Sequence, residues 1–160
     1  MNIFYLHEDP QEASEMMCDK HNVKMILESA QMLSTAHRVV DGDEFADEVG
    51  LYRATHKNHP SAVWTRKTDE NYYWHFDLFK AMLGEYMFRY GKLHKCMDLF
   101  YPLEMAPKNI NRGGFTPPPQ CMPDEYKGDD TVEAYRKYYM GEKAGFAKWK
   151  ARETPEWFSV

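Results

Sequence analysis

The stretch from Cys18 to Arg38 constrains the fold most, because it contains neither glycine nor proline and can form one long helix. At 3.6 residues per turn, its apolar side chains fall on one stripe, which must pack against other elements. We expect Val23, Ile26, Leu27, Ala30 and Leu33 on that stripe, with His21, Lys24, Glu28 and Gln31 on the opposite face.

The polar face of this expected helix places three different chemical groups in a row. His21 lies three residues before Lys24, and Lys24 lies four residues before Glu28, so their side chains are neighbours on a helix surface. The row presents an imidazole, an ammonium group and a carboxylate. An ordinary solvent-exposed helix face would show the same pattern. The row therefore indicates a functional site only if another reactive group lies near it.

The composition is that of a folded protein, with 43% hydrophobic and 15% aromatic residues. A chain of 160 residues can bury a core, and we expect residues 1–160 to form a single domain. No apolar run approaches the length of a membrane span, and the N-terminus lacks the pattern of a signal peptide. The three cysteines are too few for a disulfide scaffold, so we expect a cytoplasmic protein.

The signals in the first half of the chain predict helices on both sides of a loop. Asp9 and Pro10 are typical of a helix start, and Asp41-Gly42-Asp43 has the chemistry of a turn. Residues 43–60 are polar, and we expect them to form a loop. Pro60 suits the first turn of the short helix that follows.

The second half predicts two more helices separated by an extended segment. One helix is expected from about Asp69 to Tyr90, ended by Gly91, and the last from Asp130 to Lys150. Residues 102–123 hold six of the nine prolines and predict a long surface connection. The fold class is therefore all-α, a bundle of about three main helices. The residues expected to be buried in the helix ended by Gly91 are Tyr73, Phe76, Leu83 and Met87.

The α-amino group of Met1 is the second part of the predicted site. Because Asn2 is too large a neighbour for routine removal of Met1, we expect the mature chain to begin there. α-Amino groups have reference pKa values of about 7.7–8.0, so a usable fraction is unprotonated near neutral pH. Such an amine can attack a sugar C1′ and form a Schiff base, while a carboxylate stabilises the cationic sugar. A chain end without a chemical role is the alternative.

Histidine and cysteine pairs suggest a metal, but their spacing is not that of a zinc finger, so we expect no metal or other cofactor. A metal-dependent hydrolase using His56, His59 and His94 is the weakest hypothesis. His37 falls toward the apolar stripe and is expected to be a hydrogen-bonded core histidine. The pairs are Cys18 with His21, His56 with His59, and His94 with Cys96.

Aromatic and basic residues alternate between Tyr135 and Lys150. Bases can stack on tyrosine and tryptophan while lysine and arginine contact phosphates. A core helix rich in tyrosine explains the pattern equally well. The net charge of −5 is not that of a typical nucleic-acid-binding protein, although basic residues gather locally between His56 and Lys67.

The chain resembles the pyrimidine-dimer DNA glycosylase/AP-lyase (phage endonuclease V-like) family. In that family a histidine precedes the glutamate of the first long helix by seven residues, as His21 precedes Glu28 here. The aromatic-basic run of Tyr135 to Tyr139, followed by Gly141 and Lys143, is similar to the family's DNA-contacting segment. The segments 57–60 and 89–91 are similar to stretches of bacterial relatives.

The resemblance implies an all-α DNA glycosylase and AP lyase, an endonuclease of DNA repair whose N-terminal amine is the nucleophile. Met1 and Glu28 would be catalytic, and the partner would be damaged or modified duplex DNA. The chain departs from the family at Asn2, Leu27 and Gln31, where arginines are usual. The residues expected to bind DNA are Asn2, His21, Lys24, Lys57, His59, Arg66, Arg136, Tyr138 and Lys143.

The departures and the acidic charge favour an alternative: a non-catalytic nucleotide- or partner-binding phage accessory protein, such as a counter-defence factor, in the host cytoplasm. Salt-sensitive binding to DNA separates this alternative from the enzyme. The sequence leaves open the lesion, the oligomeric state, and whether the ligand is DNA or a free nucleotide.

Overall fold

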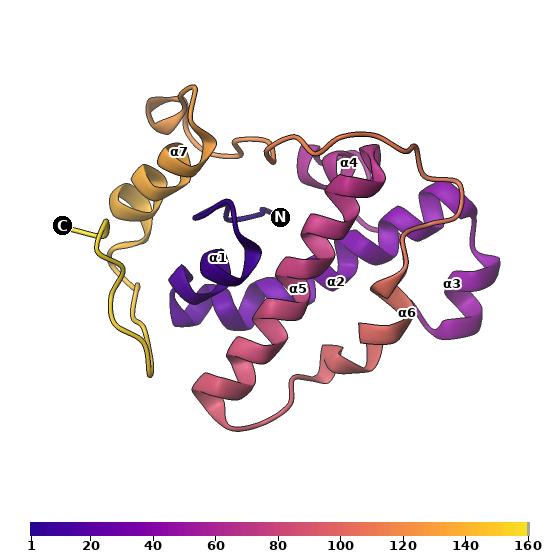
Figure 1. Ribbon diagram of the computed structural model, residues 1–160, viewed down its shortest axis with the longest axis horizontal. Coiled ribbons are helices and arrows are strands. Elements are labelled where there is room, and N and C mark those ends of the chain that lie inside the picture. Colours follow the sequence, from indigo (N-terminus) through magenta and orange to yellow (C-terminus); the bar gives the residue numbers. More distant parts are fainter. Residues whose placement is uncertain (160) are drawn as a thin grey trace.

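Two long helices, α2 (Asp19–Asp41) and α5 (Asp69–Tyr90), form the centre of the fold in a computed structural model that describes residues 1–159. Figure 1 shows them crossing, with the shorter elements arranged around them. Residues 1–159 contain no β-strand, which confirms the expected all-α fold. The shorter elements are α1 (Pro10–Met16), α3 (Glu44–Val49), α4 (Pro60–Lys67), η1 (Lys95–Leu99), α6 (Phe100–Glu104), η2 (Asp124–Tyr126), α7 (Thr131–Tyr138) and the π-helical turn η3 (Tyr139–Lys143).

The helix ends predicted from local signals are confirmed. The Asp9 side chain accepts a hydrogen bond of 3.2 Å from the Gln11 backbone N–H, with Pro10 in the first turn of α1. His59 caps α4 in the same way through Nδ1. Gly91 ends α5 with a φ of 68°, in the left-handed region that glycine adopts without steric cost.

Two predicted boundaries differ from the structure, and a third point that the sequence left open is settled. A break after Met16 separates α1 from α2. The expected loop of residues 43–60 contains the short helix α3. The last helix ends as a π-helical turn at Lys143 instead of continuing to Lys150.

The buried face of α2 differs from the predicted stripe by about one position. Ile26, Ala30 and Leu33 are buried as expected, but Val23 and Leu27 are exposed at 39% and 41%. Because α4 and α5 both pack against α2, its buried face is broad and includes several polar residues. Those polar residues are His21, Asn22, Ser29, Ser34, Thr35 and His37.

The buried face of α5 shows a similar difference. Phe76 and Leu83 are buried as predicted, whereas Tyr73 and Met87 are exposed. His37 of α2 is buried and its Nε2 lies 2.9 Å from the hydroxyl of Tyr72 on α5, which confirms the expected core histidine.

The first residues of the chain are buried although they form neither a helix nor a strand. Residues 3–6 belong to the hydrophobic core. The Phe4 ring stacks on the His21 ring, with 4.1 Å between centroids and an interplanar angle of 12°. The Asn2 side chain donates to the Cys121 carbonyl and accepts from the Tyr135 hydroxyl. These contacts fix the position of the chain start.

Most of the proline-rich segment of residues 102–123 lies across the surface, as predicted, but residues 102–104 belong to α6 and are not extended. Figure 1 shows it passing by α4 on its way from α6 to α7. It is tied down by hydrogen bonds: the Thr116 backbone N–H donates to Asn71 Oδ1, and Trp64 Nε1 donates to the Thr116 carbonyl. The connection also brings Cys121 beside Asn2.

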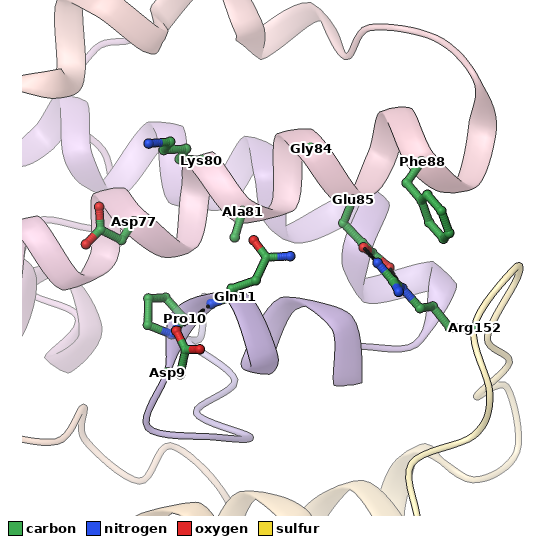
Figure 2. A pocket seen from close by; sticks show the side chains of 10 residues that line it. All are labelled: Asp9, Pro10, Gln11, Asp77, Lys80, Ala81, Gly84, Glu85, Phe88 and Arg152. Carbon is green, nitrogen blue, oxygen red and sulfur yellow. Dashed lines mark hydrogen bonds and ion pairs between the residues drawn. The ribbon is translucent and has the colours of Figure 1, made fainter.

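The C-terminal segment is attached to α5 by a buried ion-pair network. Glu85 accepts hydrogen bonds from Arg89, at 2.7 Å, and from Arg152 of the segment that follows η3. Figure 2 shows Glu85 and Arg152 at one end of a hollow of about 540 Å³ that also borders α1. No helix within residues 1–159 combines the length and the apolar character needed to cross a membrane.

Candidate functional site

The site is formed by one carboxylate between two amino groups. The α-amino nitrogen of Met1 lies 3.5 Å from Glu28 Oε1, and Lys24 Nζ lies 3.8 Å from Glu28 Oε2. The Glu28 side chain is 15% exposed and the Lys24 side chain 65% exposed. The structure therefore brings together the two residues predicted to be catalytic, on the middle of α2, where the Met1 side chain is 5% exposed.

The chain start reaches Glu28 because the residues after Met1 are held on both sides. Phe4 lies on His21, about two turns before Glu28 on the same helix. Asn2 is held by Cys121 and Tyr135, which belong to the far end of the sequence. No local sequence signal predicts this clamp, because it joins segments more than one hundred residues apart.

The prediction that His21 lies on the exposed polar face is wrong. Its ring is 5% exposed, and Nδ1 lies 2.6 Å from the Tyr139 hydroxyl. Burial lowers the pKa of His21 to about 3, and the charges of Lys143, Lys24 and Lys20 act in the same direction. A buried neutral ring has no charge to offer a phosphate, so His21 supports Phe4 instead.

Two other residues expected at the DNA use their polar atoms inside the fold. Arg136 Nε donates a hydrogen bond of 3.0 Å to the Leu6 carbonyl, and its guanidinium lies over the Trp157 ring. Asn2 holds Cys121 and Tyr135, as described above. Both residues therefore anchor the N-terminal segment.

Tyr138 and Lys143 lie together at the surface beside that segment. Lys143 Nζ is 4.6 Å from the centre of the Tyr138 ring, a cation–π contact. The Tyr138 ring also packs near Phe4, with 6.4 Å between centroids. Both side chains are partly exposed, so they border the chain start without being buried by it.

The three residues near α4 that were predicted to bind DNA differ in their exposure and contacts. Lys57 is exposed. Burial lowers the pKa of His59, the positive charges of the Met1 amine and His56 add to this effect, and Glu28 opposes it. The Met1 amine and Glu28 are thus both close enough to His59 for their charges to shift its pKa. Arg66 is half-buried, which lowers its pKa, and its Nη1 has no hydrogen-bond partner among the described residues.

The histidines proposed for a metal-dependent hydrolase are not gathered into one set. Within residues 1–159, no three histidine, cysteine or acidic side chains lie close enough to hold a metal ion. His94 Nδ1 accepts the Cys96 backbone N–H at the start of η1, and its ring packs against Tyr86. This geometry contradicts a shared site of His56, His59 and His94.

Comparisons with protein-family models, with curated proteins and with solved structures found no match. The geometry around Glu28 therefore carries the functional inference. Its features are an amine and a carboxylate within 3.5 Å, a second amine on the exposed side, and an aromatic clamp that holds the chain start.

Proposed function

We propose that this protein is a DNA glycosylase and AP lyase that acts on damaged or modified DNA through the α-amine of Met1. The observation that carries the proposal is the 3.5 Å distance between the Met1 nitrogen and the Glu28 carboxylate. A carboxylate at this distance can accept a proton from the ammonium form and then stabilise positive charge on the sugar. The resemblance to the pyrimidine-dimer glycosylases supports the same pair.

In the proposed reaction, the Met1 nitrogen forms a bond to C1′ of the target nucleotide. The bond between C1′ and the base breaks, and the base leaves with the electron pair and takes up a proton. The C1′–O4′ bond then breaks, its electron pair goes to O4′, which takes up a proton, and the opened sugar is left as a protonated Schiff base on the Met1 nitrogen. Glu28 then removes a proton from C2′, and the C3′–O bond breaks, with the electron pair leaving on the 3′ phosphate.

The exposed cations give the DNA backbone places to bind. Lys24 lies directly beside Glu28, and Lys57 and Lys143 are the further candidates for phosphate contacts. Because C1′ is poorly accessible within a stacked duplex, the target nucleotide has to be displaced from the helix. A damaged or modified site costs less to displace, which favours such sites as substrates.

Borohydride trapping tests the proposal. The protein is incubated with duplex DNA containing one abasic site or one pyrimidine dimer, and a covalent protein–DNA complex is expected after reduction. Glu28→Gln keeps the shape and removes the charge, so trapping should slow by about a hundredfold, the lower end for a lost acid–base group. The exposed Glu125→Gln is the matched control and should trap at the normal rate. A wild-type protein that forms no complex, while a known lyase does, would refute the proposal.

A second candidate function is a non-catalytic nucleotide- or partner-binding protein, such as a phage counter-defence factor. The observation that favours it is that Asn2, His21 and Arg136 are engaged inside the fold. Affinity for duplex DNA that falls steeply as salt rises would support the enzyme. A rise in melting temperature with free nucleotides, without salt-sensitive DNA binding, would support the binder.

A further inference from the structure

One arginine of this protein is partly buried but has no partner for its charge. The other arginines that are not exposed all donate hydrogen bonds to acceptors inside the fold; they are Arg38, Arg89, Arg136 and Arg152. Arg66, near the end of α4, donates no hydrogen bond and forms no ion pair within residues 1–159. Its positive charge is therefore left unsatisfied by the described part of the chain.

The guanidinium group of Arg66 is enclosed on one side only. Its Nη1 is buried without a hydrogen-bond partner, and no other unpartnered buried atom within residues 1–159 carries a permanent charge. Nε and Nη2 are not enclosed in this way, so a ligand can reach them. Burial lowers the pKa of Arg66, and no carboxylate among the described residues opposes this effect. Because removing a charge from water costs free energy unless a partner replaces the water, the group favours an incoming anion.

The accessible side of the group determines which anions fit it best. The N–H groups of Nε and Nη2 point in the same direction and match two oxygens of one phosphate or carboxylate. Such a bidentate pair of charge-assisted hydrogen bonds is stronger than a contact between two neutral groups. Arg66 is thus suited to an anion with two oxygens on one centre, and its position on α4 indicates where that anion comes from.

Arg66 lies on the edge of α4 that leads to the predicted catalytic pair. His59 precedes Arg66 by seven residues, so about two helical turns place both side chains on one edge of α4. The charges of the Met1 amine and Glu28 both reach His59, and α4 packs against α2, the helix that carries Glu28 (Figure 1). Two turns span about 10 Å, or about three phosphate spacings along one DNA strand. A strand with its target nucleotide at Met1 can therefore continue along α4 to Arg66.

We propose that Arg66 binds a backbone phosphate of the DNA strand that holds the target nucleotide, through Nε–H and Nη2–H. The identity of this ligand rests on the proposed function. The phosphate supplies the negative oxygens that the fold does not, so the free protein keeps this site at a cost in stability. Arg66 positions the strand and takes no part in breaking bonds.

Binding to a duplex with a tetrahydrofuran residue in place of one nucleotide tests the proposal. This analogue has no hydroxyl at C1′ and cannot form a Schiff base, so binding is measured apart from catalysis. Fluorescence anisotropy should show an affinity about tenfold lower for Arg66→Gln. The slope of log affinity against log salt concentration should also fall by about one. Lys92→Gln removes one charge at the opposite end of α5 and should change neither quantity. Equal effects of the two substitutions, or no binding by the wild type, would overturn the proposal.

The melting temperature separates a ligand contact from a structural role. Arg66→Met removes the unsatisfied charge and keeps the apolar stem, so it should weaken DNA binding without lowering the melting temperature. Arg89→Met is the contrast, because it breaks buried contacts with Glu85 and Asp19 and should lower the melting temperature. A clear fall in the melting temperature of Arg66→Met would show that Arg66 supports the fold, and would refute the proposal.

The NMR signal of the Arg66 Nε–H group identifies the source of the phosphate. In the isotope-labelled protein, this signal should shift with the tetrahydrofuran duplex and not with thymidine 5′-monophosphate at the same concentration. A shift with the free nucleotide alone would refute binding of a DNA strand. If the wild type is trapped on DNA but Arg66→Gln binds normally, only this inference fails. If Arg66→Gln weakens DNA binding but the wild type is never trapped, the proposed glycosylase fails and the phosphate contact stands.

Discussion

Lowering the pH from 7 to 5 should destabilise this protein strongly, because two histidines are buried in the neutral form. Burial lowers the pKa values of His21 and His75 to about 3, from a reference value of 6.5. His75 is buried between the hydroxyl groups of Thr65 and Ser29, which lie 2.8 Å and 2.9 Å from its ring nitrogens. Below pH 6.5 the unfolded chain binds protons that the folded protein does not, so stability falls with pH until about pH 3.

The magnitude follows from the size of these shifts. Between pH 7 and pH 5, each histidine should reduce the free energy of unfolding by about 2 kcal/mol, or about 4 kcal/mol together. Glu85, whose pKa is lowered mainly by Arg152 and Arg89 against the effect of burial, adds its own loss only near and below pH 4.5. The window from pH 7 to 5 thus reports chiefly on histidine.

Urea unfolding at several pH values measures this dependence. His75→Gln should lower stability at pH 7 but remove about 2 kcal/mol of the pH dependence between pH 7 and 5, because glutamine does not titrate. The exposed His56→Asn is the control and should keep the wild-type dependence. A wild-type difference below about 1 kcal/mol between pH 7 and 5 would show that these rings are not held neutral.

Three further predictions concern contacts that hold the site and the C-terminal segment. Glu85→Gln leaves two arginines without their buried carboxylate and should lower the free energy of unfolding by about 3 kcal/mol, measured with urea; a loss under about 1 kcal/mol would contradict a buried network. Tyr139→Phe leaves Nδ1 of His21 unpaired and should cost about 1–2 kcal/mol by the same assay, whereas an unchanged midpoint would argue against this hydrogen bond. Gly141→Ala places a Cβ against the Tyr126 ring and should lower the melting temperature, and adding Tyr126→Ala should restore part of the loss; no restoration would refute the steric cause.

The parts of the fold that depend on local chemistry could be predicted from the sequence. A side-chain cap at Asp9, a proline after His59 and a glycine at position 91 each determine a helix end through neighbouring backbone groups. The exact buried face of α2 could not be predicted, because it depends on which elements surround the helix. Val23 and Leu27 are exposed because α4, α5 and the N-terminal segment cover the adjacent face.

The candidate site likewise has features that could be predicted from the sequence and features that could not. The spacing of Lys24 and Glu28 and the chemistry of an α-amine were readable from the sequence. The contacts of Asn2 with Cys121 and Tyr135 were not, since they join opposite ends of the chain. Tyr135 and its neighbours looked suited to stack on bases, but Tyr135 and Tyr139 are buried against the N-terminal segment. The aromatic-basic segment thus stabilises the chain start.

The measurement that tests the Met1–Glu28 pair most directly is the attachment site of DNA in the borohydride-trapped complex. Intact mass spectrometry first establishes that the purified chain begins at Met1, and tandem mass spectrometry of the digested complex then identifies the modified amine. The pairing of the Met1 amine with Glu28 at 3.5 Å predicts that the reduced sugar is attached to the α-nitrogen of Met1. Attachment to Nζ of Lys24, the other amine beside Glu28, would contradict it, as would an unmodified chain.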